Sequence, residues 1–146
     1  MSAATNSRSR IHGPEHWSRV AANGLALATE TTGADKHVVF LFALLHDSMR
    51  ENDSYDPEHG LRAADLALEL FALLNVDPHQ LQVLTRALAE HDRGQVSDDP
   101  TIGCCWDADR LDLTRIGTMP DPRFFSTPSG RKRAEVAGAG RPRRSA

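Results

Sequence analysis

The chain has 146 residues and a mass of 16.0 kDa, which is enough for one domain and too little for two. Its content of 40% hydrophobic and 25% charged residues is typical of a folded globular protein and excludes a chain that is disordered throughout. The net charge of −3 at pH 7 argues against a protein that binds nucleic acid with its whole surface. The charge is unevenly spread, because residues 126–146 hold six Arg and Lys against Glu135 alone.

Cysteine usage and hydropathy predict a cytoplasmic protein with no membrane partner. Cys104 and Cys105 are adjacent, and neighbouring cysteines rarely reach disulfide geometry, so both are expected to be free thiols of a reducing compartment. The longest apolar run, residues 38–45, is too short to cross a membrane. Residues 1–10 lack the apolar stretch of a signal peptide.

The two ends of the chain differ in composition from its middle. Residues 1–10 are polar and aperiodic, which predicts a flexible N-terminal arm. Residues 126–146 are rich in Gly, Pro, Ser and Arg and lack an apolar face, which predicts a basic, disordered C-terminal tail. The domain itself is expected over residues 11–125. The tail could contact a polyanion or fold back on the acidic body.

Within the domain the apolar residues recur with the period of a helix, and no segment alternates as a strand does. A first helix is predicted to begin at Pro14 and to end at Gly33. Four more are predicted over residues 35–47, 57–74, 78–91 and 102–116. The second is apolar nearly all round, which predicts a buried central helix. We therefore expect an all-α, compact bundle of about five main helices.

Each predicted helix carries a histidine or an aspartate at the edge of its apolar stripe or within it. These residues are His16, His46, His59, His91 and Asp109. A single inward histidine is more often a hydrogen-bonded core residue, and a buried carboxylate costs several kcal/mol unless it is paired or bound to a metal. The same stripes carry no arginine or lysine that would form a buried ion pair. Five helices that each contribute such a residue favour a shared site for Fe, Mn, Co, Ni or Zn.

Three short motifs hold the first of these residues: H-W-S-R-V at 16–20, A-L-L-H-D at 43–47 and D-A-D-R-L-D at 107–112. Together they resemble the HD-domain superfamily of metal-dependent phosphohydrolases, and in particular its small bacterial members. The resemblance implies that fold and names four metal ligands, His16, His46, Asp47 and Asp109. Two further motifs, D-P-E-H-G at 56–60 and A-E-H-D-R-G at 89–94, resemble a subgroup that adds two histidines, here His59 and His91, and binds two metals.

The resemblance also implies the chemistry. It predicts one or two divalent metals per chain, with iron or manganese favoured and zinc, nickel, cobalt or magnesium as alternatives. Asp47 would bridge two ions, and a metal-activated hydroxide would attack a small phosphoester, for which we expect a nucleotide. His59 and His91 would hold the second ion or line the pocket.

Residues around the motifs have less specific interpretations. Arg50 is predicted to contact a substrate phosphate, or else to form a loop ion pair with Asp53 or Asp56. Arg93 has a similar but weaker signal. His12 precedes Pro14, so it is expected outside the helix, either near the substrate or on the surface.

Three further expectations concern the end of the domain and the pocket. Arg110 is predicted to pair with a surface Asp107, and Asp112 to face solvent rather than to orient a ligand. Cys104 and Cys105 are predicted to be buried core residues rather than ligands. The pocket is expected to be built from the loops at 48–56 and 93–100, which favours a small substrate.

Two other functions fit the same residues. HD-like di-iron oxygenases use the same six ligands, so the ligand set leaves oxygen chemistry open. A non-catalytic module that binds a nucleotide or metal and signals through its tail is the third hypothesis, although the complete ligand set argues against it.

Overall fold

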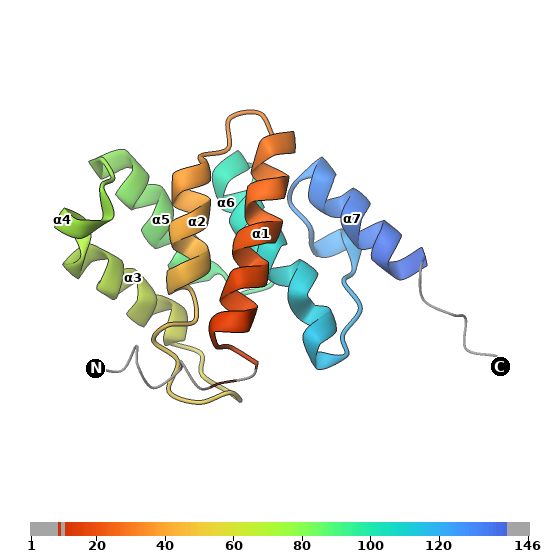
Figure 1. The fold of residues 1–146 in the computed structure, drawn as a ribbon, viewed down its shortest axis with the longest axis horizontal. Helices are drawn as coiled ribbons and strands as arrows, with labels where there is room; N and C mark the ends of the chain where they lie inside the picture. Colours follow the sequence, from red (N-terminus) through yellow and green to blue (C-terminus); the bar gives the residue numbers. More distant parts are fainter. Residues whose placement is uncertain (1–8, 10, 140–146) are drawn as a thin grey trace.

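The structure is a computed structural model, and it describes residue 9 and residues 11–139. This part of the chain is helical and contains no strand, which confirms the predicted all-α fold (Figure 1). In chain order the elements are α1 (Pro14–Glu30), α2 (Lys36–Leu45), α3 (His59–Glu69), α4 (Phe71–Leu74), α5 (Pro78–Glu90), α6 (Pro100–Leu111), the 3-10 helices η2 (Asp112–Ile116) and η3 (Pro122–Phe124), and α7 (Pro128–Ala139).

The helix starts follow the capping signals of the sequence. Helices α1, α5 and α6 each begin with proline, whose missing N–H is not needed in the first turn. Asp35 caps α2 by accepting hydrogen bonds from the N–H groups of His37 and Val38. Asp77 and Gln80 form a reciprocal capping box at the start of α5. These caps fix where the helices begin and hence which residues reach their ends.

Two predicted helices are interrupted. The helix predicted over residues 57–74 is broken at Leu70, between α3 and α4, and α4 is followed by Asn75 in the left-handed conformation with φ of 54°. The helix predicted over residues 102–116 ends at Leu111 and tightens into η2. In both cases the apolar spacing continues through the interruption, so periodicity alone does not reveal it.

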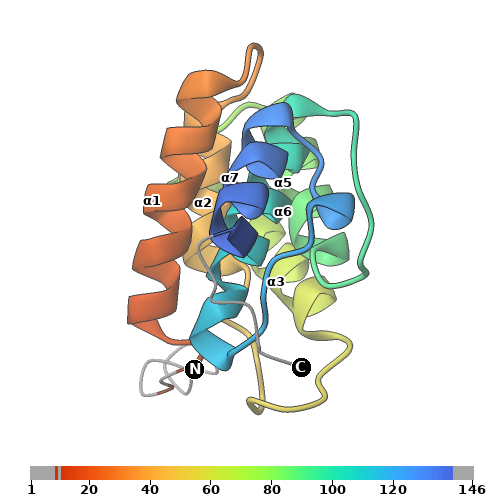
Figure 2. The ribbon, with the colours of Figure 1, turned by 90° about the vertical axis from the view of Figure 1, so that its right-hand side faces the viewer.

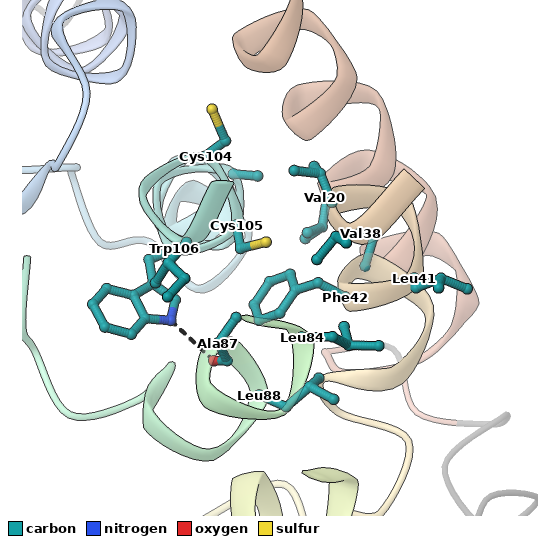
Figure 3. Close-up of a cluster of buried hydrophobic side chains, with 14 of the residues drawn as sticks. Val20, Val38, Leu41, Phe42, Leu84, Ala87, Leu88, Cys104, Cys105 and Trp106 are labelled. Atoms are coloured by element: carbon teal, nitrogen blue, oxygen red, sulfur yellow. Dashed lines mark hydrogen bonds between the residues drawn. The ribbon is translucent and has the colours of Figure 1, made fainter. Parts of the chain in front are cut away.

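The core lies between α1, α2, α5 and α6 (Figure 3). Phe42 of the apolar helix α2 is fully buried, so this helix contributes to the core as expected, but Phe40 and Leu44 are each 40% exposed and one face of α2 is therefore open. Trp106 of α6 is also buried, and its indole N–H donates to the carbonyl of Ala87 at 3.0 Å. Cys104 and Cys105 are free and buried as predicted, and burial raises the pKa of both thiols.

The predicted disorder of residues 126–146 is wrong for α7, which forms a helix packed against α6 and η3 (Figure 2). The anchor is Asp107, which is fully buried rather than on the surface. Its carboxylate accepts hydrogen bonds from the N–H of Ser126 and from the N–H and hydroxyl of Thr127 at 2.7 to 2.8 Å. Gly130 lies so close to this carboxylate that a Cβ at that position would overlap it.

A basic side chain of α7 also pairs with the acidic body. Arg133 donates to Glu30 of α1 at 2.6 Å, so part of the tail folds back on the domain, as the alternative interpretation expected. Residues 140–146, with three of the tail's arginines, and nearly all of the predicted arm at residues 1–10 lie outside the described residues. No helix in the described ranges is long and apolar enough to cross a membrane.

Candidate metal centre

The histidines singled out from the sequence meet at one end of the bundle. His16 lies in the first turn of α1 and His59 begins α3, whereas His46 and His91 are the cap residues directly after α2 and α5. All four are buried. Neighbouring helices that run in opposite directions bring the start of one beside the end of the next, and these ends lie at the lower side of Figure 1.

The first of two groups of candidate ligands consists of His16, His46 and Asp109. The Nε2 atoms of the two histidines are 2.9 Å apart. Oδ1 of Asp109 lies 3.1 Å from Nε2 of His16 and 3.4 Å from Nε2 of His46. Helices α1, α2 and α6, which pack on one another around the core, therefore bring three potential ligand atoms to one point.

The second group consists of Asp47, His59 and His91. The Nε2 atoms of its histidines are also 2.9 Å apart, and Oδ1 of Asp47 lies 3.2 Å from that of His59 and 3.6 Å from that of His91. The other oxygen of Asp47, Oδ2, lies 3.3 Å from Nε2 of His16 and 3.4 Å from that of His46. The Asp47 carboxylate therefore joins the two groups, one oxygen facing each.

The hydrogen bonds at Nδ1 set the tautomer of every one of these rings. Nδ1 of His46, His59 and His91 contacts backbone carbonyls, which can only accept, so each Nδ1 carries the proton. Nδ1 of His16 contacts the carboxylate of Asp112 at 2.7 Å, with the same result. A neutral ring with a protonated Nδ1 has its lone pair on Nε2, so within each group two lone pairs face each other and a carboxylate.

This arrangement fits divalent cations. Converging lone pairs and carboxylates repel one another unless a positive charge lies between them. Ligand atoms bonded to one ion at about 2.1 Å lie about 3.0 Å apart in octahedral coordination and about 3.4 Å apart in tetrahedral coordination. The separations within the two groups fall in or close to this range. The residues present can therefore hold two metal ions, and their nitrogen and oxygen donors suit Fe, Mn, Co, Ni or Zn.

The pKa shifts have the same electrostatic origin. Burial alone would lower the pKa of His46, but the carboxylates of Asp47 and Asp109 outweigh it and raise that pKa to about 10. Burial alone would raise the pKa of either carboxyl, but His46 and its neighbours bring both well below the usual value. The metal-free site thus favours a positive charge at the point where the lone pairs meet.

Asp112 has a position that the sequence analysis did not expect. It is 5% exposed rather than solvated, and it holds His16 by the hydrogen bond at Nδ1. Its other oxygen accepts from Nε of Arg19 at 2.7 Å. A carboxylate behind a ligand histidine fixes the ring and makes it a stronger base, so Asp112 orients a candidate ligand. Two features of the sequence could have indicated this role: Asp112 follows Asp109 by one helical turn, and Arg19, its ion-pair partner, follows His16 by three residues.

Arg50 and His12 both lie next to the site. Arg50 forms neither of the predicted ion pairs with Asp53 and Asp56; its Nε contacts Asp47 at 3.3 Å, and its Nη1 donates to the carbonyls of Asn52 and Ser54. His12 precedes α1 as expected but is 7% exposed, with Nδ1 3.0 Å from Asp53. Neither residue belongs to the two ligand groups. Arg93 is exposed and pairs with Glu90 at 3.8 Å.

Arg110 also differs from expectation, because no ion pair joins it to Asp107 in the described part of the chain. Its Nη1 donates to the carbonyl of Phe124, and its guanidinium lies over the ring of Trp106, 5.7 Å from the centroid. The residue is 8% exposed. Arg110 therefore lies on the inner side of α6, beside the site rather than on the surface.

A cavity of about 500 Å³ opens beside the two groups and is lined by Asp47, His91 and Asp109 from them. The residues at 113–125 form its apolar wall, namely Leu113, Ile116, Met119, Phe124 and Phe125. The predicted loops contribute little more than Arg50 and Gly94. The expected pocket walls were therefore only partly right, because η2 and η3 fold over the ligand end of the bundle.

No family model matches the sequence, and no curated protein matches it. Among solved structures, the chain is similar to a predicted HD superfamily hydrolase from an uncultured Thermotogales bacterium. The two are 26% identical with a TM-score of 0.73, over 94% of this chain and 79% of that chain. In its fold, and in the histidine and aspartate groups that its motifs bring together, this chain is similar to the HD-domain superfamily.

Proposed function

We propose that the protein is a metal-dependent phosphohydrolase that cleaves a small phosphoester, with a nucleotide as the expected substrate class. Asp47 carries this proposal, because its two carboxylate oxygens face two different pairs of histidines beside a cavity. A carboxylate shared in this way is typical of sites that hold two metal ions for hydrolysis. The similarity to a predicted HD superfamily hydrolase supports the same class.

The charge of the site favours an anionic substrate. The carboxylates of Asp47 and Asp109 offset only part of the charge of two divalent cations, so the loaded centre keeps a net positive charge. Divalent cations when bound would lower the pKa of a coordinated water and neutralise charge on a phosphoester. The side chains of this protein would hold the ions in place. Asp47 and Asp109 would bind them beside the histidines, and Asp112 orients the ring of His16.

The cavity suits a small substrate with an apolar part. Its volume of about 500 Å³ is typical of a pocket for one small molecule. Arg50 lines it and remains our proposed contact for a phosphate oxygen, with Asp47 keeping its guanidinium in place. The apolar wall between Leu113 and Phe125 offers a surface for a flat ring such as a nucleobase.

The proposal is tested by phosphate release from metal-loaded protein. The panel consists of p-nitrophenyl phosphate and the nucleoside 5′-monophosphates, for which phosphate is measured, each with and without a chelator. A diester, bis(p-nitrophenyl) phosphate, is followed by release of p-nitrophenol, because its hydrolysis leaves a monoester. We expect release that stops with the chelator and in Asp47→Asn. Asp65→Asn is the matched control, because Asp65 is an exposed aspartate of α3 and belongs to neither group.

Two results would overturn the hydrolase. Phosphate release that continues undiminished in Asp47→Asn would remove the metal centre from the reaction. Substrate loss that requires dissolved oxygen and yields no phosphate would favour the oxygenase, which uses the same residue types.

A further inference from the structure

Three arginines line the cavity, and they differ in how many of their N–H groups are engaged. Arg50 contacts Asp47 and two carbonyls of its own loop. Arg115 donates to the carbonyls of Ile11 and Asp112 and also lies 3.9 Å from the Asp112 carboxylate. Both side chains thus hold the walls of the site together.

Arg110 is engaged on one side only. Its Nη1 is taken by the carbonyl of Phe124, but its Nη2 is buried and has no hydrogen-bond partner within the described residues. Nine-tenths of the residue is buried. A buried donor on a charged group without a partner is costly to the fold, so such a group in a native protein calls for a ligand or a water molecule.

The carboxylates of Asp107 and Asp109 attract the Arg110 guanidinium, but within the described residues neither forms an ion pair or a hydrogen bond with it. Asp107 is saturated by Ser126 and Thr127, and Asp109 faces the histidines of the first group. Arg110 is held firmly all the same, by stacking on Trp106 and by the bond to Phe124. A rigid, buried guanidinium with one unused donor beside a cationic centre is a site for an anion.

We infer that Arg110 binds a non-bridging oxygen of the substrate phosphate through Nη2, next to the metal centre in the same cavity. The inference rests on the proposed function and names a residue that positions its substrate. Phe124 links Arg110 to the apolar wall of the pocket. Its backbone carbonyl accepts a hydrogen bond from Arg110, and Phe124 itself is part of that wall. The wall would then receive the rest of the phosphoester while Arg110 and the metal centre hold its phosphate.

Inorganic phosphate is the probe that tests this contact without catalysis. It is titrated calorimetrically into metal-loaded protein and into Arg110→Gln and Arg110→Lys. A hydrogen bond to a charged group is worth about 1.5–3 kcal/mol, so we expect Arg110→Gln to bind phosphate about 10- to 100-fold more weakly. Arg110→Lys keeps the charge but loses the planar fork, and a smaller loss of about 3- to 10-fold is expected.

Arg86→Gln is the matched control, because Arg86 is an exposed arginine of α5 that pairs with Glu90. We expect its phosphate affinity to equal that of the unaltered protein. Metal content and melting temperature are measured for every variant, since a purely structural Arg110 would lower the melting temperature and leave phosphate binding intact. Should Arg110→Gln fail to fold, Arg110→Lys decides the question.

The outcomes separate this inference from the proposed function. If the Arg110 variants bind phosphate weakly and the unaltered protein hydrolyses no ester of the panel, the anion site is supported and the hydrolase is refuted. Equal phosphate affinity in the folded variants and the unaltered protein would refute the anion site, and the unsatisfied Nη2 would then be served by water. A KM for p-nitrophenyl phosphate that rises in parallel with the phosphate dissociation constant would support both.

Discussion

The two ligand groups share a carboxylate but are supported differently. In the first group, Nδ1 of His16 rests on the carboxylate of Asp112, which is itself held by Arg19. In the second, Nδ1 of His59 and Nδ1 of His91 contact backbone carbonyls, and a carboxylate, that of Asp92, comes no nearer than 3.6 Å to Nδ1 of His59. The carboxylate makes the imidazole of His16 a stronger base, so we expect the first group to hold its ion more tightly. The types of ligand do not predict which group binds its ion more tightly. The atom that contacts Nδ1 of each histidine does.

We expect the largest effect on metal content at Asp47, which both groups share, and a smaller one at His59, which belongs to the second group only. Asp47→Ala removes the oxygen that faces each group, so we expect it to abolish bound metal and phosphate release together. His59→Ala removes one ligand of the second group only, so about one ion per chain should remain. Elemental analysis of both variants measures the difference. If Asp47→Ala keeps as much metal as His59→Ala, then Asp47 does not join the two groups.

Asp112→Asn tests the support of the first group directly. The amide has the size of the carboxylate but not its charge, and loss of such a partner typically weakens metal affinity about 10- to 100-fold. Competition with a chromogenic chelator should show weaker binding of the tighter ion and no change in the other. Asp65→Asn again serves as the control. An unchanged affinity for the tighter ion would contradict the ranking of the two groups.

Gly60→Ala tests the second group through its helices. A Cβ on Gly60 would overlap the carbonyl oxygen of Leu88 and crowd that of Ala89, so α3 and α5 would have to separate beside His59 and His91. We expect a loss of about 1–3 kcal/mol in the free energy of unfolding and a weakened second ion, measured by urea denaturation and metal analysis. Gly138→Ala is the control: it lies in open space, so the alanine should be neutral or slightly stabilising.

We expect the smallest effect, on stability alone, at Asp35, which caps the start of α2 at the opposite end from His46. Partial burial alone would raise its pKa, but hydrogen bonds from Gln80 and from the N–H groups of Val38 and His37 lower it below 3.8. A folded-state pKa below the unfolded one stabilises above pH 3.8, and this contribution is lost as the pH falls through the folded value.

Asp35→Ala should therefore cost about 1 kcal/mol at pH 7, the usual value of a cap. The difference from the unaltered protein, followed by urea unfolding at several pH values, should shrink below pH 4. A difference that grows in acid would contradict this assignment. Metal content should not change, because Asp35 lies at the far end of α2 from His46.

The histidines and Asp109 could be singled out because the helical period places them at the edge of an apolar stripe or within it, as at His16 and His91. Asp47, and the assignment of all six as metal ligands, came from the resemblance to the HD-domain superfamily. Asp112 was missed because its place one turn after Asp109 fits a solvated face equally well. Its burial comes from long-range contacts with His16 and Arg19 of α1. Helix α7 was missed because its buried residues, Gly130 and Ala134, carry almost no apolar signal. Its anchor is the set of hydrogen bonds to Asp107, a tertiary contact that periodicity cannot predict.

The cavity wall was missed for a related reason. The residues at 113–125 form only a short 3-10 helix on either side of a loop, and their apolar side chains have no regular spacing. The ligands are specified by local helix geometry, whereas Arg110 acquires its surroundings from the fold-back of Phe124 onto α6. Local patterns thus predicted the centre, and long-range contacts shaped the pocket around it.

The central claim is that the chain holds two metal ions between its two groups of ligands. Elemental analysis of protein purified without chelator or added metal, and again after reconstitution with iron or manganese, tests it directly. We predict about two ions per chain in the unaltered protein and about one in His59→Ala. One ion or none per chain after reconstitution of the unaltered protein would contradict it.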